Sequence, residues 1–216
     1  VVLGFGISGS EAVKELIARG TDPGCIVVID QSASRIAEAE AAGCNVLQGD
    51  ASNDDTLIDV HIAKAQSVLV SAGRDDTSIL MVLTVRHLSP QVPISVVIRA
   101  QDNELLARQA GANNVINPVS FTGLLLAGSA QGAHVADYMA DLAGIGGRVQ
   151  LRERPVSGEE IGRSLDQLAS GGRGLRIYRG GKPYGFWEPE TQRLEAGDDI
   201  VEVIRCEECE ASVPGA

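Results

Sequence analysis

A glycine-rich loop near the start of the chain has the residue types and spacing that bind a pyrophosphate. The loop, Gly4–Gly9, follows a short apolar run and opens a helical pattern, and Asp30 ends the next apolar run. Glycines let the backbone approach phosphates at a helix N-terminus, and an acidic residue about 20 positions further on accepts a hydrogen bond from a ribose hydroxyl. We therefore predict a nucleotide site whose loop contacts come from Gly4, Gly6, Ile7, Ser8 and Gly9.

Further polar candidates follow later apolar runs, and the carboxyl ends of parallel strands meet at one ligand-binding edge of a sheet. They are Gln31, Arg35, Asp50, Ala51, Ala72, Gly73, Arg74 and Arg99. Asp30 favours a free ribose over a 2′-phosphate. Arg99 is the most informative candidate, because an arginine that follows an apolar strand needs an anionic partner. That partner is either a bound phosphate or, within the chain, Asp75 or Glu104.

Candidates for catalysis and for metal binding are few. The three histidines lie on or near helical patterns, where surface or capping roles are expected, and no Ser/His/Asp or Cys/His spacing stands out. Cys206 and Cys209 have the spacing of zinc ligands, but no second pair follows them. Acidic pairs could attract a divalent cation, although helix starts and turns explain most of them. We predict no catalytic residue, no metal ligand and no enzyme.

Residues 1–118 alternate between short β-branched runs and segments with helical apolar spacing. Because the strand runs are almost continuously apolar, they predict a parallel sheet that is buried on both faces. We therefore predict an α/β fold with a doubly wound, six-stranded, Rossmann-like parallel sheet. Its expected strands are Val1–Gly4, Ile26–Asp30, Asn45–Gln48, Ser67–Ser71, Ile94–Ile98 and Val115–Asn117.

The rest of the chain divides into a helical arm and a small lobe. Residues 119–146 predict a crossover helix or hinge, helical from Ser120 to about Ala143 with a bend at Gly132. Its two apolar faces indicate burial on both sides, either on its own sheet or on a second subunit. Residues 147–207 predict an α+β lobe, and residues 208–216 an acidic tail. The lobe's expected elements are strands Arg148–Arg152, Leu175–Tyr178, Tyr184–Trp187 and Asp199–Arg205 and a helix Gly158–Leu168.

Composition excludes several classes of protein. The formal charge of −11 opposes binding to phosphate backbones, and aromatic residues make up only 3% of the chain, so we predict no nucleic-acid partner. The longest apolar run, Phe121–Ala130, is interrupted and falls short of the ~20 residues that span a bilayer. Four scattered cysteines fit a reducing cytoplasm better than a disulfide framework. The chain begins inside a predicted strand, so we expect a preceding segment.

The motifs together have a family resemblance. Residues 1–118 resemble the regulator-of-potassium-conductance (RCK) domain of TrkA-N type, through GFGISG, IVVID, VLQGDASNDDTL, VSAGRDDTS and VVIRAQDNELLARQAGANNVINP. VSFTGLLLAGSAQGAHVADYMADLA is similar to the crossover helix of channel-attached members, and residues 148–205 resemble the TrkA-C lobe through VSGEEIGRSLDQL and LEAGDDIVEVI. The resemblance implies a cytoplasmic sensing module at the inner face of the cell membrane. Such a module forms homodimers that assemble into a ring and gate a potassium channel or transporter, whose pore could lie on the same full-length chain.

The resemblance also implies roles for individual residues. These are phosphate contacts from Gly4, Gly6, Gly9, Arg74 and Arg99, a ribose contact from Asp30, and adenine contacts from Asp50 and Ala51. Two departures from the family pattern bear on the ligand. Arg99 and Gln101 stand where calcium-activated members carry acidic residues, so a calcium site of that type is not expected. Ile7 and Ser8 replace the arginine that some ATP-binding members place in the glycine loop, which leaves NAD(H) and ATP/ADP both open.

Two rival functions compete with that of a regulatory nucleotide-binding module. One is a fragment of an NAD-dependent oxidoreductase, which would need an acid/base pair from a substrate domain. The lobe after Gly147 offers no histidine for such a pair. The other is a structural dimerisation domain whose nucleotide site is vestigial. An assay of NADH turnover distinguishes an oxidoreductase from a regulatory module. A melting temperature that rises with nucleotide distinguishes a regulatory module from a structural dimerisation domain.

Overall fold

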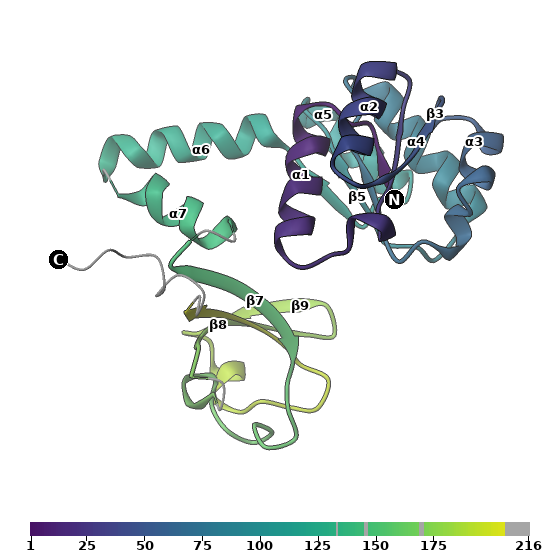
Figure 1. The fold of residues 1–216 in the computed structure, drawn as a ribbon. Helices are drawn as coiled ribbons and strands as arrows, with labels where there is room; N and C mark the ends of the chain where they lie inside the picture. The colour runs from purple at the N-terminus through teal and green to yellow at the C-terminus, as the bar shows by residue number, and fades with distance from the viewer. Residues whose placement is uncertain (133, 145–146, 169–170, 206–216) are drawn as a thin grey trace. The chain divides into compact units, whose positions relative to one another are not determined.

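The computed structural model describes residues 1–132, 134–144, 147–168 and 171–205. The chain divides into two compact units, Val1–Ala127 and Gly128–Ala216, which we call the N-terminal and the C-terminal unit (Figure 1). The predicted acidic tail and the Cys206/Cys209 pair lie outside the described residues. Within the described residues, no helix is long and apolar enough to cross a membrane.

The N-terminal unit contains the predicted six-stranded parallel sheet, in the order β3-β2-β1-β4-β5-β6. The sheet is confirmed, with strand ends that fall within about two residues of the predicted ones. Because β4 lies on the other side of β1 from β2, the strand order reverses between β1 and β4. The strands are β1 (Val2–Leu3), β2 (Val27–Asp30), β3 (Asn45–Gln48), β4 (Val68–Val70), β5 (Ile94–Val97) and β6 (Asn114–Ile116).

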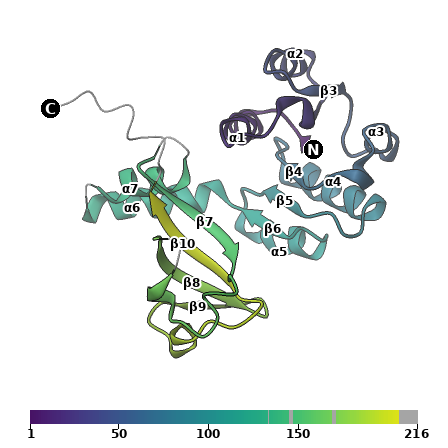
Figure 2. The same ribbon diagram turned by 60° about the horizontal axis from the view of Figure 1, so that its bottom comes forward.

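Helices cover both faces of this sheet (Figure 2). Successive strand residues point to opposite faces, so Leu3 packs in one apolar cluster and its neighbour Val2 in another. The first cluster includes Val82 of α4, and the second includes Val13 of α1. The helices are α1 (Ile7–Ala18), α2 (Ala33–Ala41), α3 (Asp54–Asp59), α4 (Asp75–Leu88), α5 (Gln101–Gln109) and α6 (Pro118–Gln131), with short 3₁₀ turns η1 (Pro23–Cys25) and η2 (Ile62–Lys64).

The predicted single helix Ser120–Ala143 is two helices. α6 begins at Pro118 and ends at Gln131, and α7 (Val135–Ala143) begins four residues later. Gly132, where we expected a bend, lies between them and belongs to neither. Most of the large apolar side chains of α6 are exposed.

The C-terminal unit is built on a four-stranded antiparallel sheet in the order β7-β10-β8-β9 (Figure 2). Its strands are β7 (Val149–Pro155), β8 (Arg173–Arg179), β9 (Lys182–Gly185) and β10 (Asp199–Arg205), with 3₁₀ turns η3 (Leu165–Gln167) and η4 (Pro189–Gln192). The small apolar core joins Leu165, Ile177, Leu194 and Ile200.

Two predictions for this unit are wrong in detail. The expected helix Gly158–Leu168 is a series of turns that ends in η3. Gly162 has a φ of +86°, which an α-helix cannot contain, and its N–H donates to Leu194 O instead of to a helical carbonyl. The expected strand Tyr184–Trp187 is shifted toward the N-terminus, because Arg179 pairs directly with Lys182 across a two-residue turn. Phe186 and Trp187 therefore follow the strand, with their rings in edge-to-face contact.

The C-terminal unit buries acidic side chains beside arginines. Asp198 is fully buried and accepts two hydrogen bonds of 2.8 Å from Arg179. These bonds lower the pKa of the Asp198 carboxyl, although its burial opposes that shift. Glu160 and Glu202 are also fully buried, and both accept hydrogen bonds from Arg154. Two ion-pair clusters thus lie next to an apolar core of modest size.

Candidate nucleotide-binding site

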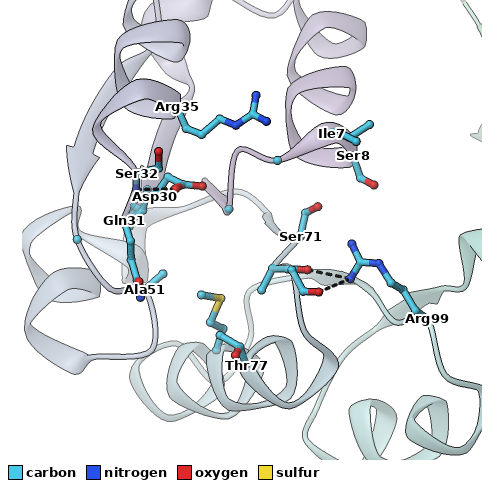
Figure 3. Close-up of a pocket in the computed structure, with 17 residues that line it drawn as sticks. Ile7, Ser8, Asp30, Gln31, Ser32, Arg35, Ala51, Ser71, Thr77 and Arg99 are labelled. Atoms are coloured by element: carbon cyan, nitrogen blue, oxygen red, sulfur yellow. Dashed lines mark hydrogen bonds between the residues drawn. The ribbon is translucent and has the colours of Figure 1, made fainter.

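A pocket of about 590 Å³ lies at the carboxyl edge of the parallel sheet, where the strand order reverses between β1 and β4 (Figure 3). Open α/β sheets bind their ligands at this position, and the volume is ordinary for a small-molecule site. Residues that line the pocket come from the loops that follow β1, β2, β3, β4 and β5 and from the helices α1, α2 and α4. The predicted candidates among them are Gly4, Gly6, Ile7, Ser8, Asp30, Gln31, Arg35, Ala51, Ala72, Gly73 and Arg99.

The three glycines of the loop have different local surroundings. Gly4 has a φ of +93°, and a Cβ added there would lie 2.5 Å from Ser71 O. A Cβ at Gly9 would overlap Gly4 O, so Gly9 is required for packing of α1 on the loop, and it does not line the pocket. Gly6 lines the pocket and has open space around its Cβ position. The loop therefore needs Gly4 and Gly9 to fold, and Gly6 is open to the pocket.

The N-terminus of α1 supplies donors to the pocket. Gly6 is its N-cap residue, no side chain caps this end, and its first turn contains no acidic residue. The first N–H groups of a helix have no partner within the helix, and the helix dipole adds positive potential at that end. A phosphate beside Ile7 and Ser8 would meet these groups directly.

Asp30 is held in place by the loop that it faces. Its Oδ2 accepts a 2.7 Å hydrogen bond from Phe5 N. Its Oδ1 accepts a 2.8 Å bond from Ser32 N (Figure 3). The carboxylate thus fixes the glycine loop and the turn after β2. Each carboxylate oxygen can accept a further bond, so Asp30 can still bind a ribose hydroxyl. On the same side, Arg35 lines the pocket while its Nη1 bonds to Glu38 at 2.9 Å.

Arg99 approaches the pocket from the end of β5. Its Nη1 donates to Ala72 O at 3.0 Å and to Gly73 O at 3.3 Å (Figure 3). Within the described part of the chain, its Nε and Nη2 have no hydrogen-bond partner. Neither carboxylate that the sequence offered as a partner forms an ion pair with this guanidinium. Asp75 instead accepts the main-chain N–H of Arg99, and Glu104 bonds to Asn117.

Besides Gly9, two predicted candidates lie outside the lining of this pocket, Arg74 and Asp50. Arg74 is 79% exposed, and its Nε and Nη2 donate to the carboxylate of Asp76. Asp50 accepts bonds of 2.9 Å and 2.7 Å from the N–H and hydroxyl of Ser52. These bonds lower the pKa of the Asp50 carboxyl. Its neighbour Ala51 does line the pocket.

The structure adds lining residues that the sequence reasoning missed, among them Ser32, Ser71, Thr77 and Met81. Ser71 directly follows β4, so the rule that ligands bind at the carboxyl edge could have found it, whereas Met81 reaches the pocket from the second turn of α4. The ionisable groups of the lining are Asp30, Arg35 and Arg99. In the ranges that the structure describes, no three His, Cys, Asp or Glu side chains gather at a metal-binding distance.

A doubly wound sheet with a glycine loop at its switch point defines a dinucleotide-binding class of α/β domain. Residues 1–118 match the TrkA-N domain family, and the chain belongs to that family. It is therefore a regulatory domain of the RCK/TrkA-N kind rather than an enzyme. The oxidoreductase alternative loses its support with this finding.

Several relatives of the chain have names that refer to potassium transport. The chain is 33% identical over 126 residues to a protein named as the K(+) efflux antiporter KefB in Alkalimonas amylolytica, covering 58% of this chain and 19% of that protein. It is 24% identical over 209 residues to potassium channel protein 1 of Methanocaldococcus jannaschii, covering 93% of this chain and 61% of the channel. This chain thus spans less than two thirds of each relative.

Among solved structures, the GsuK channel has the same fold. Its RCK domain is 22% identical, with a TM-score of 0.53, over 98% of this chain and 44% of that one. The GsuK channel bound to NAD is 21% identical, with a TM-score of 0.53, over 98% of this chain and 37% of that one. At this level of identity the likeness shows the shared fold alone.

Proposed function

We propose that the N-terminal unit binds an adenine nucleotide, NAD(H) or ATP/ADP, and thereby regulates potassium transport through a channel or transporter. The observation that carries this proposal is the pocket itself, which combines the uncapped N-terminus of α1, a fixed Asp30 and two free donors of Arg99. The NAD bound to the GsuK channel supports an adenine nucleotide as the ligand. The potassium transporters among the relatives support the regulated process.

The nucleotide would lie across the switch point of the sheet. Its ribose hydroxyls would bond to Asp30, with the adenine beside Ala51. Its phosphates would meet the N–H groups at the start of α1, near Gly6. A second phosphate, or the far half of a dinucleotide, would reach Arg99, whose planar fork suits a phosphate. The module would act at the cytoplasmic face of the membrane that holds its pore partner.

Two arginines of this unit provide a matched test of the proposal. Arg99→Ala removes a cation from the pocket, and we expect it to weaken nucleotide binding about ten- to a hundred-fold, the scale of a lost hydrogen bond to a charged group. Arg74→Ala removes an equal charge from the neighbouring loop after β4. Because Arg74 does not line the pocket, nucleotide affinity should change less than about two-fold. Calorimetry of the full chain with NAD(H), ATP and ADP measures both.

Two results of this experiment would contradict the proposal. If no adenine nucleotide binds the wild type more tightly than millimolar, the site is vestigial and the chain is a structural domain. If Arg74→Ala weakens binding as much as Arg99→Ala, the effect is general electrostatics, and Arg99 has no special role at the phosphates. Thermal melting of each variant without ligand checks that both retain the wild-type fold.

We also propose that α6 packs against a second copy of the chain, as a crossover helix, in a dimer that assembles into a ring. Its apolar side chains Phe121, Leu124 and Leu126 are 49%, 72% and 67% exposed. A 14-residue helix with these side chains in water is unusual for a surface helix. A partner helix would remove them from water.

Leu124→Glu tests this arrangement, because it places a charge in the proposed dry interface. We expect the dimer to dissociate at least a hundred-fold more readily, since burying an unpaired charge costs several kcal/mol. Ile58→Glu on α3 is the control, because Ile58 is 55% exposed and lies on a helix for which no partner is proposed. Sedimentation of the wild type as a monomer at micromolar concentration would contradict the crossover arrangement.

A further inference from the structure

The loops after β4 and β5 hold each other by reciprocal hydrogen bonds. Arg99, at the end of β5, donates from its side chain to the carbonyls of Ala72 and Gly73 in the loop after β4. Asp75, the first residue of α4, returns the contact, because its Oδ1 accepts Arg99 N at 3.0 Å and its Oδ2 accepts Ala100 N at 2.9 Å. Each loop therefore binds the backbone of the other through one charged side chain, and both loops line or adjoin the pocket.

The same carboxylate of Asp75 extends the contact into α5. Its Oδ2 also accepts a 3.0 Å bond from Asn103 Nδ2. The next residue, Glu104, accepts a 2.7 Å bond at Oε1 from Asn117 Nδ2. Two successive residues of α5 therefore make these contacts. Asn103 bonds to Asp75 beside the pocket, and Glu104 bonds to Asn117, which follows β6. Figure 2 shows α5 beside β6, and the two elements are in contact.

Asn117 completes the connection, because it caps α6. Its Oδ1 accepts 3.0 Å bonds from Val119 N and from Ser120 N. Asparagine is a preferred N-cap residue, and Pro118 occupies the first helical position, where a missing N–H does no harm. One amide side chain therefore bonds through Nδ2 to α5 and through Oδ1 to the first turn of α6. These three bonds together fix the orientation of the amide.

We propose that a path couples the pocket to the N-terminal cap of α6. It runs by hydrogen bonds from Arg99 and Asp75 to Asn103, along the backbone to Glu104, and by a hydrogen bond to Asn117. A phosphate that engages Nε and Nη2 of Arg99 would pull on the same guanidinium that bonds to the carbonyls of Ala72 and Gly73 through Nη1. The resulting shift of the two loops acts on Asp75, then on the first turn of α5, and then on the cap of α6. The inference rests on the proposed nucleotide for its natural input, but its contacts do not depend on a ligand.

A cycle of variants without ligand tests the coupling directly. The readout is amide exchange at Val119 and Ser120, followed by NMR in the full chain. Glu104→Ala should speed this exchange about three- to ten-fold, the range of a weakened helix cap. Asp75→Ala should produce part of the same effect alone, and no additional effect when Glu104→Ala is already present. Equal, additive effects of the two variants would show independent sites and overturn the path.

Two control variants separate the path from general effects on the fold. Asp102→Ala removes a negative charge from the same first turn of α5, so it matches Glu104→Ala in the helix dipole and in net charge. It should leave exchange at Val119 and Ser120 unchanged. Glu104→Gln retains an oxygen that accepts from Asn117, and it should restore slow exchange. A loss of protection with Asp102→Ala, or no rescue with Glu104→Gln, would contradict the assigned contact.

Addition of nucleotide then tests whether the path is used. With NAD(H) or ATP added at saturation, exchange at Val119 and Ser120 should change in the wild type and in Asp102→Ala, but not in Glu104→Ala. Calorimetry on the same samples should show the same affinity in all three. A wild type that binds nucleotide with no change at these amides overturns the coupling. A wild type that binds none overturns the proposed function, and the ligand-free cycle still decides the path.

Discussion

Arg154→Met is expected to cost the C-terminal unit about 3–5 kcal/mol of its free energy of unfolding, because it breaks a buried ion pair. The Arg154 guanidinium lies between two fully buried carboxylates. It donates two bonds of 2.7 Å to Glu160 and a 2.8 Å bond to Glu202 Oε1. These hydrogen bonds, first to Glu160 and then to Glu202, raise the pKa of Arg154 above its ordinary value. The guanidinium of an arginine is charged throughout the ordinary pH range, so the cluster contains a permanent cation.

Removal of Arg154 takes guanidinium bonds away from two fully buried acids, Glu160 and Glu202. Arg152 donates to Glu202 Oε1 through Nε and Nη2, at 2.9 Å and 2.6 Å, but its side chain is 42% exposed. Its bonds are to Glu202, so Glu160 loses both of its guanidinium bonds. A domain is stable by only about 5–15 kcal/mol, so a loss of this size places the unit near its unfolding threshold.

Urea unfolding of the full chain measures this effect. Trp187 is the single tryptophan of the sequence and lies in the C-terminal unit, so its fluorescence reports on that unit. Arg176→Met is the control, since Arg176 lies exposed on β8 of the same sheet, and we expect it to change stability by less than about 0.5 kcal/mol. If the two variants unfold at the same urea concentration, the buried cluster does not stabilise the unit.

The parallel sheet could be predicted because its signals are local and repeated. Each strand is a short β-branched run, and each connection has helical apolar spacing, so six repeats support one another. In the C-terminal unit the signals conflict. The apolar residues Ile161, Leu165 and Leu168 have helical spacing, but Gly162 adopts a positive φ and Glu160 bonds to Arg154 on β7. Tertiary contacts override the local pattern there.

The sequence predicted which loops form the site. It was less informative about which side chains of those loops line the pocket. Arg74 and Arg99 both lie in loops that follow strands, and the family resemblance implies phosphate contacts for both. The structure separates them because Asp76, two residues after Arg74, binds its guanidinium outside the pocket, whereas Arg99 reaches back to Ala72 and Gly73. The reciprocal role of Asp75 was also hidden, since it depends on backbone N–H groups of another loop.

Gly9→Ala and Gly6→Ala are both expected to weaken nucleotide binding, but only Gly9→Ala is expected to lower the stability of the fold, although both change one glycine of the same loop to alanine. The Cβ of Gly9→Ala would overlap Gly4 O. That carbonyl cannot easily move, because Gly4 N bonds to Ile29 O and the loop is also fixed by Asp30. We expect Gly9→Ala to lose at least about 1–3 kcal/mol of stability, as overpacked sites do, and to lose nucleotide binding with the distorted loop.

Gly6→Ala should leave the fold intact. Gly6 has a φ of −73°, which any residue adopts, and nothing lies within 4 Å of the added Cβ. The free energy of unfolding without ligand should therefore stay within about 0.5 kcal/mol of the wild type. The added methyl occupies space at the N-terminus of α1, where the backbone must approach the phosphates closely. We expect nucleotide affinity to fall at least about ten-fold, which is roughly 1.4 kcal/mol of binding free energy.

Thermal melts with and without nucleotide measure both quantities in one series. The wild type should melt at a higher temperature when nucleotide is added, because a ligand that binds only the folded state stabilises it. Gly6→Ala should match the wild type without ligand and show little shift with it, and Gly9→Ala should melt lower in both conditions. If Gly6→Ala gains as much from nucleotide as the wild type does, the phosphates do not approach this loop. The ligand would then have to lie elsewhere along the carboxyl edge, and the role assigned to the glycine motif would be wrong.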